Sequence, residues 1–488
     1  MTPEATILLA LVVPLAGAGL IAAAHSLPNL REAITLLTAG LLFLLVASLF
    51  PEVAAGGRPA VTLFEVMPGL ALKFEVEPLG MLFGLVASGL WIVNSLYSIG
   101  YMRGNNEAHQ TRFYVCFAGA LASAVGIAFS GNLLTLFLFY EALTLITYPL
   151  VTHHGTPEAV RAGRVYLGLL VGTSIAFLLV AIIWTWHIAG SIDFTASGIL
   201  RGKASNAVIG VLLALYVFGI GKAAVMPVHR WLPAAMVAPT PVSALLHAVA
   251  VVKAGVFSVL KIVIYVFGVD AIAGVKSVDW LPFISGFTII AASVVALRSD
   301  NLKRRLAYST VSQLSYVVLA AALLTPLSIV GAALHIATHA LGKITLFFAA
   351  GAIYTAAHKT EVSQLDGIGR RMPWTMAAFT VGALSLIGIP PAAGFVSKWF
   401  IISGALAGGH YLALAVLIAS TLFNAAYFLP IVHAAFFRAP DDGRENHERH
   451  EHGEAPWPMV VALTVTAAMT VAFFFLADLP LKLGEQLR

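Results

Sequence analysis

The sequence predicts an all-α, polytopic membrane protein with about fourteen transmembrane helices. Of its 488 residues, 59% are hydrophobic and only 10% are charged, and the mean hydropathy is +0.91. Such a composition is typical of a chain whose surface faces mostly lipid. Apolar runs of roughly 17 to 25 residues, the length that crosses a bilayer as a helix, recur along the whole chain. Two of these runs also contain prolines beside a lysine, which indicates interrupted helices.

The apolar runs predict the order of the spans. The N-terminal run lacks the basic region of a cleaved signal peptide and is expected to be the first permanent span. The predicted spans are 4–24, 32–50, 79–99, 113–130, 132–152, 165–187, 207–227, 238–267, 280–297, 306–323, 327–355, 374–404, 409–437 and 457–477. The one long polar stretch, 438–456, is rich in His and Glu and is expected to be a solvated loop rather than a metal site.

The basic residues predict the orientation of the chain. If the N-terminus is outside, sixteen Lys and Arg fall in inner loops and seven in outer segments, which places both termini outside by the positive-inside rule. The net charge of +5 is small and scattered, so nucleic acid is not an expected partner. The single cysteine, Cys116, excludes an internal disulfide and a cysteine-ligated cluster.

Six charged residues fall inside the predicted spans. A charge at bilayer depth is costly, so such a residue is by default a functional candidate. Five are lysines and one is a glutamate: Lys222, Lys253, Lys261, Lys343, Lys398 and Glu141. Lys261 lies near the end of its span, and we expect its ammonium to extend to the interface, outside the site.

Glu141, midway along the fifth span, is predicted to pair with Lys222. Burial favours the neutral amine of a lysine and a nearby carboxylate favours the ammonium, so making and breaking the pair would switch a proton site. A protonated glutamic acid that only ties helices together remains the alternative.

Histidines accompany the other lysines. His247 and Lys253 are six residues apart, about 120° on an ideal helix, so they line one path only if the helix is distorted or the path crosses it. His335, His339 and Lys343 recur every four residues and form a row on one helix face, about 6 Å per step. A metal bound by the two histidines would lack a nearby carboxylate or thiolate. No metal, haem or other cofactor is therefore predicted.

Two broken spans carry lysines. Pro227 follows Lys222, and Pro390 and Pro391 precede Lys398 in SLIGIPPAAGFVSKWF. Prolines free backbone carbonyls, which are tolerated at membrane depth only where protein or water satisfies them. Broken spans at corresponding positions indicate inverted repeats. The predicted division is 1–103 (spans one to three), 104–268 (first repeat), 269–437 (second repeat) and 438–488 (polar loop and last span).

With these motifs, the chain resembles the antiporter-like subunits shared by respiratory complex I, Mrp-type cation/proton antiporters and membrane-bound hydrogenases. The resemblance runs from LYSIGYM near residue 97 to the thirteenth span. Its most specific parts are FYEALTL around Glu141, the GKAAVMPVHRWLPAAMVAPTPVSALLHAVAVVKAGVF block, LKRRLAYSTVSQLSY at 302–316, HIATHALGKITLFF and IGIPPAAGFVSKW.

The resemblance implies fourteen core helices, two inverted five-helix repeats with a discontinuous helix in each, and a midplane chain of buried charges. It implies that Glu141 and Lys222 form the gating pair. It also implies that the relay continues through His247, Lys253, His335, His339 and Lys343 to Lys398 on the exit side. Arg164 stands where the family often has a lysine, and an arginine hardly titrates.

The predicted function is that of a proton-translocating subunit of an Mrp-type antiporter in a bacterial inner membrane. The alternative is an antiporter-like subunit of complex I or a hydrogenase, within a redox-driven translocase. Expected partners are other membrane subunits, membrane lipid, and protons, with sodium left open. Two further classes are a solute permease and a quinone- or haem-binding anchor protein. The permease would need a ligand-sized midplane cavity and the anchor would need axial histidines.

Overall fold

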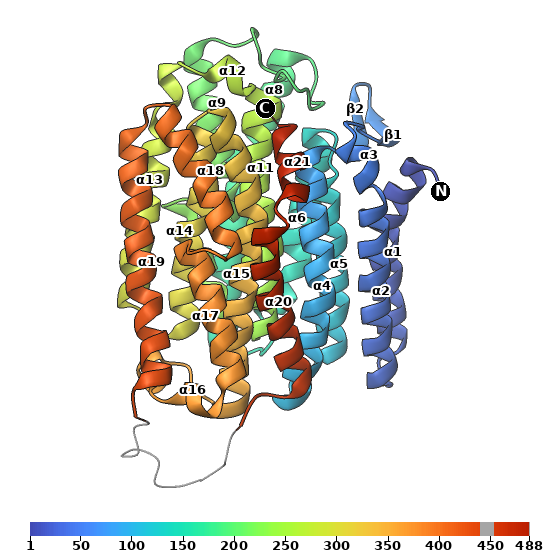
Figure 1. Cartoon of the computed structure of the whole chain (residues 1–488). Helices are drawn as coiled ribbons and strands as arrows, with labels where there is room; N and C mark the ends of the chain where they lie inside the picture. Colours follow the sequence, from blue (N-terminus) through green and yellow to red (C-terminus); the bar gives the residue numbers. More distant parts are fainter. Residues whose placement is uncertain (440–452, 488) are drawn as a thin grey trace.

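The computed structural model describes residues 1–439 and 453–487. They form a bundle of long helices whose axes are nearly parallel (Figure 1). Helical segments lie at all fourteen predicted positions. Within residues 1–439 and 453–487, eleven helices are long and apolar enough to cross a membrane. The other three positions hold segments that are shorter or more polar, so the total of fourteen spans stays a prediction. Most of the predicted His-rich loop lies outside the described residues.

The helices of the first half begin at signals visible in the sequence. Thr2, Asn132, Thr156 and Ser205 each accept a backbone N–H with their side chains at a helix N-terminus. The helices are α1 Pro3–Ala23, α2 Pro28–Ser48, α3 Phe50–Ala54, α4 Pro78–Gly104, α5 Gln110–Ala128, α6 Leu133–Val151, α7 Pro157–Thr173, α8 Val180–Ala189 and α9 Asn206–Gly219.

The second half has the same kinds of signal, with Asn301 and Thr325 as side-chain caps. Its helices are α10 Trp231–Ala234, α11 Val251–Ile262, α12 Val269–Ile272, α13 Trp280–Arg298, α14 Leu302–Ala322, α15 Pro326–Ala357, α16 Ile368–Arg371, α17 Pro373–Ile387, α18 Ala393–Ala407, α19 Tyr411–Phe437, α20 Trp457–Phe475 and α21 Asp478–Glu485. Three π-helical segments extend the long helices, at Ser174–Leu179, Val242–Ala250 and Val263–Phe267.

A small β-hairpin departs from the all-α prediction. Strands β1 Ala60–Met67 and β2 Leu70–Glu75 pair antiparallel through a turn at Gly69, whose φ of +79° favours glycine. The hairpin lies beside the turn between α5 and α6, where the Gly131 N–H donates to the Lys73 carbonyl at 2.9 Å. We call this side of the bundle the hairpin end.

Two helical segments form the buried centre of the bundle. In α15 and in residues 242–267, all residues of the most apolar stretch are buried. The buried share of the corresponding stretch is 39% in α1 and 33% in α19 and α20. The last long helix, α20, returns to pack against α4 and α15, as Figure 1 shows. The central position of α15 and α11 matters because these two helices carry most of the histidines and lysines of the predicted site.

Helix interruptions occur at both predicted places. Helix α9 ends at Gly219, where an added Cβ would lie 2.4 Å from the main-chain nitrogen of Leu178, and Lys222 follows in a 3-10 turn. Helix α17 ends at Ile387, and α18 begins at Ala393. Each interruption therefore places its lysine at or just beyond irregular backbone in the interior.

Both termini point toward the hairpin end, whereas α16 lies at the opposite end (Figure 1). That opposite end holds most of the arginines of the predicted inner loops, and we call it the arginine-rich end. The two termini therefore share one side, as the charge count predicts. The assignment of that side to the outside stays a prediction.

A charged cluster lies at the arginine-rich end. The Glu107 carboxylate is 3.7 Å from His153 Nε2 and 3.4 Å from His154 Nε2. The hydrogen bond to Glu107 raises the pKa of His154, whereas burial lowers the pKa of His153 to about 4. The pKa values of two adjacent histidines in the same loop are thus shifted in opposite directions.

The close approach at the second interruption predicts a stability effect. A Cβ on Gly394 would lie 1.8 Å from the Ser385 carbonyl oxygen. Gly394→Ala should therefore destabilise the folded protein by roughly 1–3 kcal/mol, as overpacking does. The thermal unfolding midpoint in detergent measures this. Gly168→Ala in α7 is the matched control, since nothing lies within 4 Å of its added Cβ. Equal midpoints for the two variants would contradict the packing described.

The opposed histidines predict a pH dependence. His153 is neutral in the folded protein because burial lowers its pKa. Its contribution to the free energy of unfolding is therefore complete above pH about 6.5 and is lost as the pH falls toward 4. His154 contributes below pH about 6.5, and its contribution is lost as the pH rises through its raised pKa. His153→Phe should flatten the acid-side fall of the unfolding midpoint between pH 6.5 and 4, and His154→Phe should not. An unchanged acid slope in His153→Phe would contradict this assignment.

Candidate functional site

The lysine of the first broken helix is bound by α6. Lys222 is completely buried, and its Nζ donates to the Tyr140 carbonyl at 2.8 Å and to the Thr144 hydroxyl. The ammonium also lies 3.2 Å from the centre of the Tyr140 ring, in a cation–π contact. The Tyr140 hydroxyl in turn accepts the Lys222 backbone N–H at 3.1 Å. One turn of α6 therefore supplies the whole binding site of this ammonium.

Glu141 lies beside this turn without an ion pair to Lys222. Among the described residues, no acidic oxygen lies within 4.0 Å of the Lys222 Nζ, and Glu141 Oε1 has no hydrogen-bond partner. Residues 140 and 144 share one helix face, whereas 141 is rotated by about 100°. The carboxylate still interacts electrostatically with Lys222 and with Tyr166. The predicted direct pair is thus absent here, and the two groups interact without contact.

The helix that carries His247 and Lys253 is distorted, as their shared path required. Residues Val242–Ala250 are π-helical and α11 follows without a break. Lys253 donates to the Ala248 carbonyl at 2.8 Å, within the π-helical segment, and lies 2.6 Å from His339 Nδ1. His247 faces the other way, with its ring 6.2 Å from those of Tyr166 and Trp231. The two side chains thus contact opposite halves of the bundle.

The α15 histidines form the predicted row. The rings of His335 and His339 are nearly parallel, with centres 5.7 Å apart, and both residues are buried. Lys343, one turn further, donates to the Leu306 carbonyl at 3.0 Å and to the Ser309 hydroxyl. Lys253 joins this row through His339. The row therefore continues from the first half of the chain into the second.

The second broken helix binds Lys398 at its own break. The Lys398 Nζ donates to the carbonyls of Leu386 at 2.7 Å and Ile387 at 3.1 Å, the last residues of α17. Helix C-termini leave such carbonyls unpaired and carry partial negative charge, so they suit an ammonium. Because the helix stops here, the charge is bound without a carboxylate.

Tyr316 and Ser397 connect the row to Lys398. The Tyr316 ring stacks on His335 with centres 5.4 Å apart, and the Lys398 ammonium lies 5.0 Å from the centre of the same ring. Ser397 Oγ lies 2.9 Å from His335 Nδ1. Hydrogen bonds at the two ends of the row, Lys253 to His339 and His335 to Ser397, and the parallel rings of His335 and His339 between them, therefore lead from Lys253 to the residue adjacent to Lys398. Sequence reasoning missed the tyrosines, since nothing in their spacing sets them apart.

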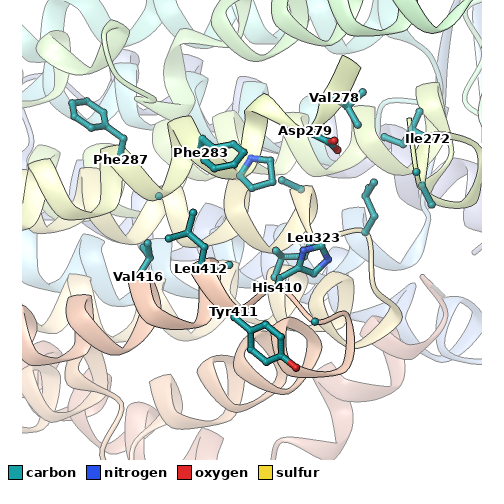
Figure 2. A pocket seen from close by; sticks show the side chains of 18 of the residues that line it. Ile272, Val278, Asp279, Phe283, Phe287, Leu323, His410, Tyr411, Leu412 and Val416 are labelled. Carbon is teal, nitrogen blue, oxygen red and sulfur yellow. The ribbon is translucent and has the colours of Figure 1, made fainter. Parts of the chain in front are cut away.

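A larger groove lies away from these residues. It measures about 900 Å³ at the hairpin end between α13 and α19, and Figure 2 shows its apolar walls, among them Phe283, Phe287 and Leu412. Its titratable residues are Asp279, His410 and Tyr411. None of the eight predicted relay residues lines it, so the groove offers no midplane cavity of the kind that a permease would need.

Comparisons with known proteins bear on this arrangement. The family model described as "NADH:quinone oxidoreductase/Mrp antiporter, TM" matches residues 130–424. The NADH-quinone oxidoreductase subunit N of Desulforudis audaxviator is 33% identical over 84% of this chain and 81% of its own length. The chain belongs to the NADH:quinone oxidoreductase/Mrp antiporter family. It is therefore an antiporter-like, multi-pass membrane subunit.

Other family members differ in length and setting. A component of a probable K(+)/H(+) antiporter of Rhizobium meliloti is 31% identical over 86% of this chain, and hydrogenase-4 component B of Escherichia coli is 30% identical over 82%. The matches cover only 42% and 62% of those two relatives.

Solved structures show the same fold. A chain of the Mrp complex from Dietzia sp. DQ12-45-1b superposes with a TM-score of 0.88, 23% identity and coverage of 100% of this chain and 97% of that one. A chain of the archaeal membrane-bound sulfane sulfur reductase gives 0.85, 24% identity and coverage of 99% and 97%. At these identities the likeness concerns the fold alone.

The prediction that the Lys261 ammonium extends to the membrane interface is wrong. Its side chain is completely buried, and its Nζ donates to Glu77 Oε1 at 3.1 Å and to the Ser130 carbonyl at 2.8 Å. Glu77 also accepts the Tyr265 hydroxyl and the backbone N–H groups of Leu79 and Gly80 at the start of α4. The hairpin covers this end of the span, so the ammonium has no path to the interface. Glu77 was missed because it precedes its apolar run and resembles a loop residue in sequence.

This buried pair predicts a strong coupling in stability. Lys261→Met leaves the Glu77 carboxylate buried without its cation and should cost about 3–5 kcal/mol of unfolding free energy. Adding Glu77→Gln should recover part of that loss, which a double-mutant cycle in detergent would measure. The control is Lys203→Met, since Lys203 is exposed at the same end. Additive losses would contradict a direct pair.

Proposed function

We propose that this chain is the proton-translocating membrane subunit of a multi-subunit cation/proton antiporter of Mrp type in a bacterial inner membrane. Its relay consists of Glu141, Lys222, His247, Lys253, His335, His339, Lys343 and Lys398. The observation that carries the proposal is the buried run of contacts from Lys253 through His339 and His335 to Ser397, beside Lys398. The relative that supports the antiporter assignment is the probable K(+)/H(+) antiporter component of Rhizobium meliloti, 31% identical over 86% of this chain.

In this proposal each broken helix has its own role, proton loading at the first and proton release at the second. Residues 104–268 form the first repeat and residues 269–437 the second, flanked by 1–103 and 438–488. Protons load near Lys222 at the first break, pass Lys253 and the α15 row, and leave near Lys398 at the second break. Glu141 acts on Lys222 through its charge and gates loading. One charge that crosses 100 mV gains or loses about 2.3 kcal/mol, an amount that one nearby carboxylate can supply.

A second candidate, an antiporter-like subunit of a complex I-type oxidoreductase, is favoured by one observation. The subunit N relative has the higher identity of the two kinds of relative, 33% against 31%, and the match covers 81% of its length. Partners separate the two candidates. Purification in mild detergent should yield small membrane subunits alone for the antiporter, and a flavin- or iron–sulfur-bearing module for the oxidoreductase. Co-purification of such a redox module would overturn the Mrp assignment.

The relay predicts the effect of neutral substitutions. Glu141→Gln and Lys398→Met should each lower proton translocation at least tenfold in membrane vesicles from the source organism, while the complex still assembles. The reason is that Glu141→Gln removes the charge that acts on Lys222, and Lys398→Met removes the charge at the second break. Glu158→Gln and Lys482→Met are the matched controls, because both side chains are exposed. Full translocation in Glu141→Gln would remove it as the gate, and full translocation in Lys398→Met would remove it from the path.

A further inference from the structure

The groove between α13 and α19 opens on the outer face of the bundle (Figure 2). The most apolar stretches of these two helices are only 44% and 33% buried, so most of their side chains face outward. Phe283 and Phe287 of α13 and Leu412 of α19 line the groove and are 60% exposed or more. In a multi-pass membrane protein, an outward apolar surface of this kind lies in the hydrocarbon core.

Short side chains make room for the groove. Gly286 of α13 and Ala413 of α19 both line it, and both are buried. A Cβ added to Gly286 would lie 3.5 Å from Val416 of α19, so the two helices approach each other closely there. The interior of a protein is close-packed, and a groove of about 900 Å³ between two packed helices is therefore room for another molecule.

The depth of the groove matches one leaflet of a bilayer. From Asp279 to Ile290, the lining residues extend about 16 Å, since a helix rises about 1.5 Å per residue. The hydrocarbon core is about 30 Å thick, so one leaflet is about 15 Å. On the other wall the lining residues stop at Val416, although α19 continues to Phe437. A partner's transmembrane helix would need a seat across the whole core, whereas a lipid chain occupies one leaflet.

The rim of the groove offers polar groups of both hydrogen-bonding kinds. The Asp279 carboxylate accepts hydrogen bonds, and the His410 ring and the Tyr411 hydroxyl can donate them. Within residues 1–439 and 453–487, none of these three side chains makes a hydrogen bond or an ion pair. Figure 2 shows Asp279 and His410 toward one end of the groove and Phe287 toward the other. A carboxylate suits an ammonium and the two donors suit a phosphate, so the rim complements a zwitterionic head group.

We propose that this groove binds one molecule of an amine-bearing phospholipid, phosphatidylethanolamine, from the leaflet at the hairpin end. An acyl chain lies along Phe283 and Leu412, the ammonium donates to Asp279, and the phosphate accepts from His410 and Tyr411. Asp279 selects the lipid, because its charge disfavours an anionic head group and the quaternary ammonium of phosphatidylcholine has no N–H to donate. No relay residue lines the groove, so the inference goes beyond the proposed function and stands without it.

Photocrosslinking identifies the occupant. The photoreactive p-benzoylphenylalanine replaces Phe283 in the assembled complex, in vesicles of equal parts phosphatidylethanolamine, phosphatidylcholine and phosphatidylglycerol with the same acyl chains. Among the lipid adducts, phosphatidylethanolamine should exceed each of the other two about fivefold by mass spectrometry. The matched control is Phe475, an exposed phenylalanine of α20 outside the groove, where adducts should follow the vesicle composition. Equal adducts at Phe283 would overturn the selectivity, and a protein adduct there would show that a partner subunit fills the groove.

Charge variants test the rim. Asp279→Asn should return the adducts at Phe283 to the vesicle composition, and Asp279→Lys should favour phosphatidylglycerol. Lys276→Gln is the matched control, since Lys276 is exposed in the same loop but does not line the groove, and it should keep the preference. An unchanged preference in Asp279→Asn would overturn the role of the carboxylate.

Thermal unfolding separates lipid binding from a loss of fold. In lipid-free detergent, Asp279→Asn should leave the unfolding midpoint unchanged, because the Asp279 side chain has no partner among the described residues. Added phosphatidylethanolamine should raise the midpoint of the parent protein and not that of the variant. Glu141→Gln should keep the lipid preference. If Glu141→Gln stops translocation and the preference is absent, the relay stands and the lipid site fails; if the preference is present and translocation is normal, the reverse holds.

Discussion

The binding of ammonium groups by main-chain carbonyls is the constraint on which the interior of this protein depends. Each of the five lysines in the spans donates to a backbone oxygen at 2.7–3.0 Å. The acceptors are the carbonyls of Tyr140, Ala248, Ser130, Leu306 and Leu386. A buried charge without such partners would cost many kcal/mol, and carbonyls of an unbroken helix are already used by the next turn. Irregular backbone or a helix end supplies the acceptor carbonyl for three of these lysines, Lys253, Lys261 and Lys398.

The acceptors show how the fold meets this need. Leu386 is at the end of α17, Ser130 follows the end of α5, and Ala248 lies in a π-helical segment. Tyr140 and Leu306 lie inside helices, and there a hydroxyl, from Thr144 or Ser309, supplements the carbonyl. Interruptions that look like defects in a membrane helix thus provide binding sites for charge. Main-chain oxygens carry no net charge, so a lysine bound in this way can lose its proton without leaving a carboxylate behind.

The carboxylates of Glu77 and Glu141 illustrate two different roles for the same group. Glu77 accepts four hydrogen bonds, two of them from the start of α4, and holds Lys261 in a saturated pair. Glu141 has an unpartnered oxygen and no contact with Lys222. A saturated carboxylate has one favourable state and fixes the structure, whereas an unsaturated one can change its partner. The distribution of hydrogen bonds, more than the presence of charge, separates an anchor from a candidate gate.

By itself the sequence determined the membrane class, the positions of the long helices and the interruptions around Lys222 and Lys398, because hydropathy and proline are local properties. It also determined the four-residue spacing of His335, His339 and Lys343, which a helix converts into a row. Only the tertiary structure decided the partners. It turned Lys261 inward to Glu77, placed Tyr316 between His335 and Lys398, and left Glu141 without direct contact to Lys222. It also formed the β-hairpin and the groove between α13 and α19. These features join residues that are far apart in the chain, and no local pattern records which helix faces which.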